Sequence, residues 1–403
     1  MRRRCLGILV GAAALVGCTR HDLVDAAIST AYRDDDLADA SPEAARGRVV
    51  LLAGDLHCHV APPDESSDVV RGLGETIELA RRERLDFIVL TPHVGARFFQ
   101  TAEGRASVAA SQAELREEIA RRAPGGLTLV PGFEYTDHRY GHVGVSFANL
   151  DDVLAAVPLQ EAKDRPERFF EEWVARGGLL VVNHPLVTPI EGAIVPMARA
   201  DLSFRPWTSK APFPPEIEAI DRLARGFEVF NLAATELRDR LLLGEAEDTI
   251  DETFEALDAK IPEARRRMTP VGGSDSHSHH LRATTFALSA DRSPSALRDA
   301  IVQGRTCVRS RAACSFEVRP TGGEWETVGA TFEDGGDFDV RAHGEAIDVY
   351  VDGRWVASPE SDEIARVALP TDRCSVVRAR VDEGFSAPIY VHCGIRAEGA
   401  HGD

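Results

Sequence analysis

The sequence predicts an α/β protein in which a barrel of the (β/α) kind is followed by a small antiparallel β domain. From residue 48 onward, apolar strand patterns alternate with helical patterns, which is typical of parallel strands joined by crossover helices. After about residue 310 the pattern changes to short alternating strands separated by glycine turns. The 403 residues, 44% of them hydrophobic, are enough for one large domain and a smaller partner.

The first 17 residues have the pattern of a signal peptide. Three arginines precede a short apolar run from Leu6 to Val16, well under the roughly 20 residues that span a bilayer. The following "LVGC" resembles a bacterial lipobox, which implies cleavage before Cys18 and lipid attachment to its thiol; an ordinary secretory signal is the alternative. Residues 18–46 are polar and acidic and predict a tether. We therefore expect a cell-envelope protein, attached to the membrane by its N-terminal lipid and facing outside the cytoplasm.

The charge of the chain argues against nucleic acid as a partner. The formal net charge is −19, and it becomes −22 when Arg2, Arg3 and Arg4 leave with the signal peptide. A surface this acidic repels phosphate backbones. We therefore expect a small-molecule substrate.

Two cysteines near the C-terminus flank a predicted hairpin. Cys374 and Cys393 are symmetric about a turn at residues 383–384. An exported protein can oxidise such thiols. A cross-strand disulfide and two buried free thiols are both open at this point.

The elements predicted between residues 47 and 310 follow one another as strand and helix. The predicted strands cover residues 49–57, 86–92, 127–135, 142–147, 179–185, 227–231, 269–275 and 284–290. The predicted helices cover residues 74–84, 111–122, 166–176, 216–225, 246–264 and 294–303. The long proline-rich connection 188–226 contains Trp207 and Lys210, and ordered loops of this kind often cover active sites. Residues 311–403 form the predicted antiparallel β domain.

Polar side chains gather at the carboxyl ends of these predicted strands. In "GDLHCHV", Asp55, His57 and His59 alternate along one strand, so they share a face and lie about 6–7 Å apart. Two imidazoles placed in this way can bind one metal ion. Further histidines and carboxylates follow at Asp64, His93, Glu134, His142, His184, Asp275 and His277. Because they fall at one end of successive strands, the set predicts a site for two or three divalent ions, and its mixed ligands suit zinc, manganese or iron.

The ordered series "DLHCH", "TPH", "GFE", "GHV", "NHP" and "GSDSH" resembles the PHP superfamily, the polymerase and histidinol phosphatase domain, over residues 48–310. The resemblance implies a distorted (β/α)7-type barrel with its metals at the carboxyl ends of the strands. It also implies three metal positions: His57, His59, Glu134 and Asp275 hold the first, Glu134 bridges to a second with His142 and His184, and Asp64, His93 and His277 form a third. The segment "ALRDAIVQGRTCVRS" and the C-terminal strands are further similar to the carbaryl-hydrolase-like branch of the superfamily.

The series departs from the family pattern at one position. Pro92 stands in "TPH" where the family usually has an aspartate. Proline keeps the preceding Thr91 extended but supplies neither a carboxylate nor a donor. The neighbourhood of the third position therefore lacks one group that the family has there.

A centre of this kind predicts a hydrolase. Two close ions clamp a phosphoryl or acyl centre and lower the pKa of a bound water to about 7. We expect phosphoester hydrolysis, with His277 or Asp275 moving a proton to the leaving group. The candidate substrate contacts are Arg97, Lys210, Arg282, Arg305 and Arg309, of which Arg282 is nearest in sequence to the last ligand motif. Hydrolysis of a carboxyl or carbamate ester, and a non-catalytic metal-containing envelope lipoprotein, are the alternatives.

Overall fold

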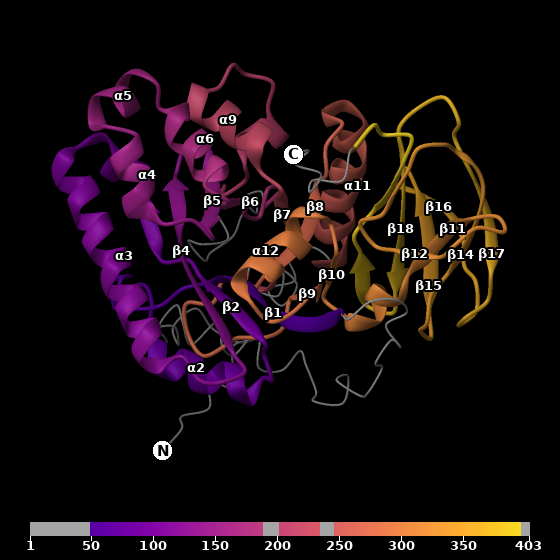
Figure 1. Cartoon of the computed structure of the whole chain (residues 1–403), viewed down its shortest axis with the longest axis horizontal. Helices are drawn as coiled ribbons and strands as arrows, with labels where there is room; N and C mark the ends of the chain where they lie inside the picture. The colour runs from indigo at the N-terminus through magenta and orange to yellow at the C-terminus, as the bar shows by residue number, and fades with distance from the viewer. Residues whose placement is uncertain (1–48, 188–200, 234–245, 396–403) are drawn as a thin grey trace, which may run out of the picture.

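The computed structural model describes residues 49–187, 201–233 and 246–395 and has a mixed α/β fold. Helices pack around a large sheet in the first part of the chain, and the C-terminal strands gather at the opposite side, away from most of the helices (Figure 1). Among the residues that the structure describes, no helix combines the length and the apolarity needed to cross a membrane. Cys18 and the predicted signal peptide and tether lie outside these residues.

The eight strands that the sequence predicts in the first part are all present, together with two short strands, at residues 93–95 and 306–308, that lie outside the predicted ranges. They are β1 (Val50–Cys58), β2 (Phe87–Leu90), β3 (His93–Gly95), β4 (Thr128–Asp137), β5 (Gly141–Ser146), β6 (Leu179–Val182), β7 (Gly226–Asn231), β8 (Thr269–Gly273), β9 (Thr285–Ser289) and β10 (Thr306–Val308). All six predicted helices are also present, as α2 (Leu73–Arg82), α3 (Ala102–Arg122), α6 (Glu167–Ala175), α9 (Pro215–Leu223), α11 (Ala246–Ala264) and α12 (Pro294–Val302). Short helices that the sequence reasoning missed are η2 (Ala96–Gln100), α4 (Leu150–Ala156), α5 (Leu159–Asp164), α8 (Arg205–Thr208) and η3 (Arg311–Ser315).

The helices are placed by local signals and by apolar faces. Helix α12 begins where Ser293 accepts a hydrogen bond from the backbone N–H of Ala296, with Pro294 in its first turn. Helix α6 buries Phe169, Phe170 and Trp173, and the indole Nε1 of Trp173 donates to the carbonyl of Ser146 in β5. Burying one aromatic face against the sheet fixes α6 over β5.

Within the described residues, 16 strands belong to one sheet, whose main path runs β10-β9-β1-β2-β4-β5-β6-β7-β8 and continues beyond β10 into strands of the C-terminal part. Strands β1, β2 and β4 run parallel, and so do β6, β7 and β8. However, β5 is antiparallel to both of its neighbours, and β9 is antiparallel to β1. The expectation of parallel strands is therefore wrong for residues 142–147 and 284–290. The β4–β5 connection is a short turn, whereas a parallel crossover needs a dozen or more residues.

The large sheet curls until the segment after β8 meets the end of β1. The N–H of Asp275 donates to the carbonyl of His57 (2.8 Å), and the N–H of His59 donates to the carbonyl of Ser276 (3.2 Å). This contact is an isolated parallel bridge between Cys58 and Ser276 rather than a ladder. The closed seven-stranded barrel that the family resemblance implies is not confirmed, but the segment after the end strand β8 lies beside β1.

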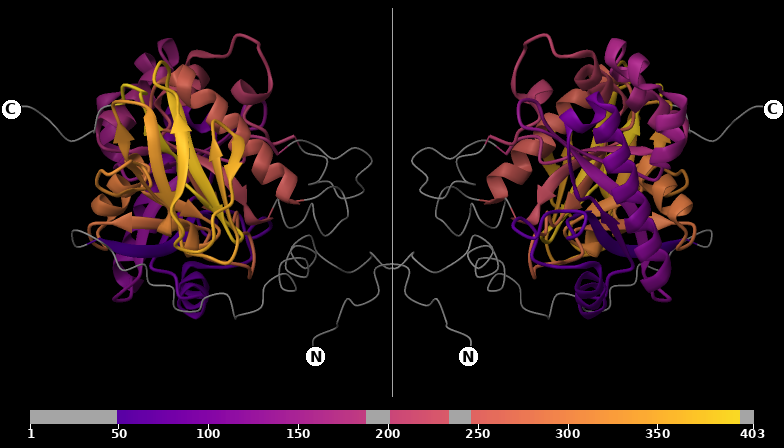
Figure 2. Two further views of the ribbon diagram at one scale, coloured as in Figure 1. Left: turned by 90° about the vertical axis from the view of Figure 1, so that its right-hand side faces the viewer. Right: turned by 90° about the vertical axis from the view of Figure 1, so that its left-hand side faces the viewer.

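The C-terminal part is built almost entirely of strands, as the glycine-turn pattern predicts, and Figure 2 shows several of them side by side in its left view. They are β11 (Glu317–Pro320), β12 (Glu326–Thr327), β13 (Thr331–Phe332), β14 (Gly336–Arg341), β15 (Ile347–Val351), β16 (Arg354–Ala357), β17 (Ala365–Leu369), β18 (Ser375–Val381), β19 (Gly384–Ser386) and β20 (Ile389–Val391). A smaller antiparallel sheet has the order β12-β11-β14-β17. The large sheet crosses the predicted domain boundary at residue 310, because β10 pairs with β9 on one side and with β19 on the other.

One disulfide lies within the C-terminal part, whereas a second disulfide and an ion pair join the two parts. Cys374 and Cys393 form a disulfide, so the cross-strand alternative is confirmed. A second disulfide, between Cys307 and Cys314, was not predicted and ties β10 to η3. In addition, the buried Nε of Arg378 in β18 donates to Oδ2 of Asp258 in α11 (2.8 Å).

Candidate metal centre

The predicted ligands come from separate strands but meet at one edge of the large sheet. The end of β1 supplies His57 and His59, and β4 supplies Glu134. His142 lies at the beginning of β5, yet it joins the same edge because β5 is antiparallel and Thr136 of β4 faces it in the register. The strand reversal that the sequence reasoning missed is thus what places His142 in the site.

The first group of ligand atoms lies around His57 and His59. Nε2 of His57 lies 3.1 Å from Nε2 of His59, 3.2 Å from Oε1 of Glu134 and 3.4 Å from Oδ1 of Asp275. Nε2 of His59 lies 3.2 Å from the same Asp275 oxygen. Atoms bound about 2.0–2.2 Å from one ion are about 3 Å apart at right angles and about 3.4 Å apart in a tetrahedron. The three contacts of Nε2 of His57 therefore have the spacing of ligands that share an ion, and these four residues are the ones in the first predicted set.

The second group shares Glu134 with the first. Oε1 of Glu134 lies 3.3 Å from Nδ1 of His142 and 3.8 Å from Nε2 of His184. Glu134, His142 and His184 could together hold an ion, and all three are buried. The amide Nδ2 of Asn183 donates to Oε1 of Glu134 (2.8 Å), which orients the carboxylate between the two groups.

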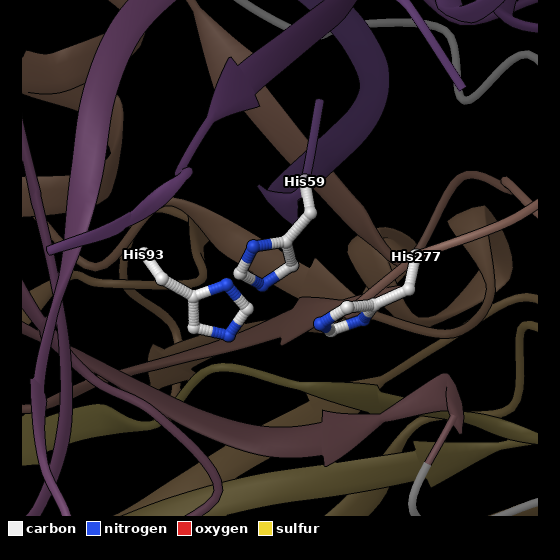
Figure 3. Close-up of side chains that lie close together, drawn as sticks. All are labelled: His59, His93 and His277. Carbon is white, nitrogen blue, oxygen red and sulfur yellow. The ribbon is translucent and has the colours of Figure 1, made fainter. Parts of the chain in front are cut away.

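The third group is formed by His59, His93 and His277 (Figure 3). The imidazole of His59 stacks on that of His93, with ring centroids 4.1 Å apart, and on that of His277 at 4.2 Å. The side chain of His93 is 32% exposed and that of His277 18%, whereas that of His59 is fully buried. This group therefore lies at the solvent side of the centre.

Five of the six imidazoles are oriented through Nδ1. Protein oxygens lie at hydrogen-bond distance from this atom in His57 (Glu228, 3.0 Å), His59 (Asp64, 3.2 Å), His93 (Asp64, 2.9 Å), His184 (carbonyl of Leu202, 3.2 Å) and His277 (carbonyl of Asp275, 2.9 Å). Histidines that bind metals almost always donate their second ring N–H to such an oxygen, which fixes the tautomer and leaves the other nitrogen for the ion. The arrangement thus leaves Nε2 available in these five residues.

Asp64, which the family resemblance assigns to the third position, contacts both His59 and His93. Its Oδ2 faces Nδ1 of His59, and its Oδ1 accepts from the backbone N–H of His93 (2.8 Å) and faces Nδ1 of the same residue. Both oxygens are therefore engaged behind the imidazoles, and the ligand group at this position contains His59 instead. Because Asp64 faces Nδ1 of His59, this imidazole can bind metal only through Nε2. One nitrogen lone pair binds one ion at a time.

Glu228 and Arg71 also contribute to the centre and were missed from the sequence. Glu228 is a lone carboxylate in the apolar strand β7 and is 2% exposed, and the need of a buried carboxylate for a partner could have drawn attention to it. Arg71 is 1% exposed and donates to the carbonyls of His59 (3.2 Å) and Ser276 (3.3 Å). Arg71 thereby joins the segment of His57 and His59 to the loop after β8, which bears Asp275 and His277.

Asp55 shares the strand face of the two histidines but serves another purpose. Its Oδ1 accepts from the backbone N–H of Ser274 (2.8 Å) and of His57 (3.1 Å), and its Oδ2 accepts from the hydroxyl of Ser274. Burial raises the pKa of Asp55 to about 6 against these hydrogen bonds. Asp55 therefore fastens β1 to the loop that bears Asp275.

The carboxylates around His57 and His59 raise the pKa values of both imidazoles. Burial lowers the pKa of His57, but the charges of Asp275 and Glu228 outweigh it and the net pKa lies well above its ordinary value. For His59, burial is likewise outweighed by hydrogen bonds to Asp275 and Asp64, which raise the pKa to about 9. Protons are thus retained where a metal would bind, and metal uptake must release them.

The donor set fits divalent ions. Asp64, Glu134, Glu228 and Asp275 place four carboxylates against the imidazoles, with side chains at most 14% exposed. Such a concentration of buried negative charge is costly unless cations compensate it. Mixed imidazole and carboxylate ligands suit zinc, manganese and iron alike.

The described part of the long connection returns to the site. The N–H of Phe204 donates to the carbonyl of Pro185, and that of Arg205 donates to the carbonyl of Tyr140. Gly141 has φ +114°, and a Cβ there would lie 2.8 Å from Cα of Phe204, so only glycine allows this approach. Trp207 stacks on Phe227 of β7 with ring centroids 5.3 Å apart. Residues 188–200 of the predicted cover lie outside the described residues.

The predicted substrate contacts are less closely tied to the centre. Lys210 is exposed just after α8, and Arg97 and Arg305 are exposed as well. Arg282 is half-buried between the last ligand segment and β9, and Arg309 lies 3.6 Å from Glu383. The roles of these five residues stay predictions.

A scan against protein-family models and a search of curated proteins both found no match for this chain. Solved structures do resemble it. One is a two-domain protein containing a predicted PHP-like metal-dependent phosphoesterase from Bacteroides vulgatus, with 16% identity, a TM-score of 0.41, and coverage of 85% of this chain and 95% of that one. Another is the lesion-specific endonuclease EndoQ from Pyrococcus furiosus, with 14% identity, a TM-score of 0.36, and coverage of 62% and 56%. A third is PsfC from Pseudomonas syringae, with 16% identity, a TM-score of 0.33, and coverage of 64% and 89%.

Proposed function

We propose that this chain is a metal-dependent hydrolase that activates water against a phosphoester with a two- or three-metal centre. The observation that supports this most is the surrounding of Nε2 of His57, which lies 3.1–3.4 Å from Nε2 of His59, Oε1 of Glu134 and Oδ1 of Asp275. The second group, Glu134 with His142 and His184, shares one carboxylate with it. A carboxylate shared by two metal groups is suited to hold two ions close together.

When bound, two close ions supply an activated water and an electrostatic clamp on the oxygens of the reacting centre. The chain's residues would position and assist this chemistry. Asn183 fixes Glu134 by donating to its Oε1. Asp275 and His277, whose side chains are 14% and 18% exposed, are near enough to solvent to transfer a proton to the leaving group. Burial and the nearby His59 lower the pKa of His277 well below its ordinary value, so its imidazole is neutral before the reaction.

The proposal includes the substrate contacts. Arg282 and Lys210 are proposed to bind the phosphate oxygens, since a guanidinium or an ammonium forms strong charge-assisted hydrogen bonds with phosphate. The net charge of −19 argues for a small molecule rather than nucleic acid. A carboxyl or carbamate ester would use the same metal ligands, so the assay below includes that class.

We also propose that the chain is a lipoprotein of the cell envelope, attached through Cys18. The two disulfides support an oxidising compartment, because disulfides are rare in cytosolic proteins. Replacing Cys18 by serine should move the protein from the detergent phase to the aqueous phase in a phase-partition experiment. A protein that partitions identically with serine at this position would contradict the anchor.

The test of function uses the purified full chain loaded with Mn²⁺, Zn²⁺ or Fe²⁺. Aryl monophosphates, aryl phosphodiesters and naphthyl esters or carbamates are assayed with and without a chelator. We expect chelator-sensitive turnover of a phosphoester and a loss of at least about 100-fold in His184→Ala. His343→Ala is the matched control, because its side chain is 62% exposed in the C-terminal part. Turnover by metal-free protein would refute the proposal, and so would stoichiometric metal binding without hydrolysis of any phosphoester.

A further inference from the structure

We propose that Glu228 is a positioning residue that sets the geometry of two metal positions at once, by orienting the imidazole of His57 and fixing the backbone of His184. The inference rests on the proposed metal-dependent function and concerns a residue outside the predicted ligand set. It is carried by three contacts of one buried carboxylate.

The first contact orients His57. Oε1 of Glu228 lies 3.0 Å from Nδ1 of His57, and both side chains are 2% exposed. The Nε2 on the other side of the ring faces Glu134 and Asp275. A carboxylate behind a metal-binding imidazole fixes the tautomer and makes the ligand more basic. Glu228 therefore determines that Nε2 of His57 is directed at the first group.

The second contact acts on the other group. Oε2 of Glu228 accepts a hydrogen bond from the backbone N–H of His184 (2.7 Å). His184 has φ +29°, in the left-handed region that non-glycine residues rarely adopt. Such a backbone conformation is unfavourable and persists only where neighbouring groups impose it. The carboxylate thus supports the conformation from which the imidazole of His184 reaches the second group.

The third contact keeps the carboxylate itself in place. Asn231, three residues later at the end of β7, donates from Nδ2 to Oε2 of Glu228 (3.2 Å) and to Oδ2 of Asp275 (3.2 Å). On the opposite side, Gly273 of β8 leaves the space that the carboxylate fills, because a Cβ there would lie 2.0 Å from Oε1 of Glu228 and 2.4 Å from Cβ of His57. Glu228 is therefore confined between β7, β8 and β1 in one orientation.

Conservative replacement separates positioning from space filling. In Glu228→Gln the volume is kept, but one carboxylate oxygen becomes an NH₂ group. This amide faces the ring N–H of His57 on one side and the N–H groups of His184 and Asn231 on the other, and its single oxygen can accept on only one side. If Glu228 only fills space, Glu228→Gln keeps what is needed, because it keeps the volume. If Glu228 positions two groups, both of its oxygens must accept hydrogen bonds, and Glu228→Gln removes one of them.

The experiment measures metal retention by the full-length protein. Wild type, Glu228→Gln, Glu228→Ala and Gly273→Ala are loaded with Zn²⁺ and titrated with a competing chelator, and the visible spectrum of the Co²⁺-loaded proteins is recorded. We expect Glu228→Gln to lose about 10-fold and Glu228→Ala about 100-fold in metal affinity, with a changed Co²⁺ spectrum. We expect Gly273→Ala to lower the metal affinity and to change the Co²⁺ spectrum as well.

Asp339→Asn is the matched control, because Asp339 is a carboxylate of similar burial (5% exposed) that pairs with Arg319 in the C-terminal part. Circular dichroism and thermal unfolding identify a variant that has not folded. Wild-type affinity and spectrum in folded Glu228→Gln would overturn the inference while leaving the proposed function standing. A wild-type protein that binds no metal would instead refute the proposed function.

Discussion

The Nε2 atoms of His57 and His59 lie 3.1 Å apart in a fully buried site, while the Nδ1 atom of each ring faces a carboxylate. Two imidazole nitrogens can approach so closely only with a proton or a cation between them. The pKa values of both residues are raised, which shows how strongly the surrounding carboxylates favour positive charge at this point. The first prediction tests this charge requirement directly.

Metal removal should destabilise the protein. An ion that binds only the folded state stabilises it by about 2.7 kcal/mol when present at 100 times its Kd. We expect the thermal midpoint to rise on addition of Mn²⁺ or Zn²⁺ to chelator-treated protein, and Ca²⁺, which prefers all-oxygen sites, to have little effect. Identical midpoints with and without the transition metals would contradict a metal centre.

Asp64 should act through the two imidazoles that it contacts. Because its oxygens face Nδ1 of both His59 and His93, Asp64→Asn gives one of them an amide donor instead of an acceptor. We expect metal affinity to weaken by about 10- to 100-fold. The metal ion bound on the solvent side of the centre, next to His93, should be lost first. Metal content after dialysis measures the effect, and the exposed Asp362→Asn is its control. Unchanged metal content would mean that Asp64 does not orient these rings.

Arg71 should be needed for stability as well as for the site. Its guanidinium donates to the carbonyls of His59, Ser276 and Ser278 and to the thiol of Cys58, and a lysine cannot span these acceptors. Arg71→Lys leaves several of them unpaired in the core, which we expect to lower the free energy of unfolding by about 2–4 kcal/mol. Urea denaturation measures this value. The control Arg82→Lys, whose side chain is 67% exposed, should change it by less than about 0.5 kcal/mol; an equal effect of both substitutions would refute the role of Arg71.

The five cysteines of the described residues should fall into two disulfides and one inert thiol. Peptide mapping without reduction should recover Cys374 with Cys393 and Cys307 with Cys314. Replacing the first pair by serine should cost about 3 kcal/mol, since it releases a loop of 19 residues. Burial raises the pKa of Cys58 to about 12, so alkylation of Cys58 should be slow until the protein is unfolded. Rapid alkylation of Cys58 in the folded protein, or different pairings, would contradict this assignment.

Much of the fold follows from local patterns in the chain. The strands from Val50 to Ser289 and six helices lie within a few residues of their predicted bounds, except that α3 begins at Ala102 rather than near residue 111. The apolar periodicity and the caps that define these elements are local properties, which explains the agreement. The direction of β5 was predicted wrongly, because apolar alternation is the same in either direction. Only the short turn between Asp137 and Gly141 indicated the reversal.

The candidate site, too, was predicted only in part from the sequence. The spacing of His57 and His59, and the series that ends with Asp275 and His277, were enough to predict a metal centre at the strand ends. The sequence could not indicate which carboxylate faces which ring nitrogen, because Glu228 and His57 are 171 residues apart and meet only when the sheet curls.

By itself, therefore, the sequence determined the order of strands and helices and the residue types that gather at one edge of the sheet, since both depend on neighbours along the chain. Only the tertiary structure decided that His142 joins from the beginning of an antiparallel strand. It also decided that Asp64 and Glu228 lie behind the imidazoles, and that the side of His93 and His277 faces solvent. These depend on how distant segments pack against one another, and the burial that results sets the charge and the orientation of every group in the centre.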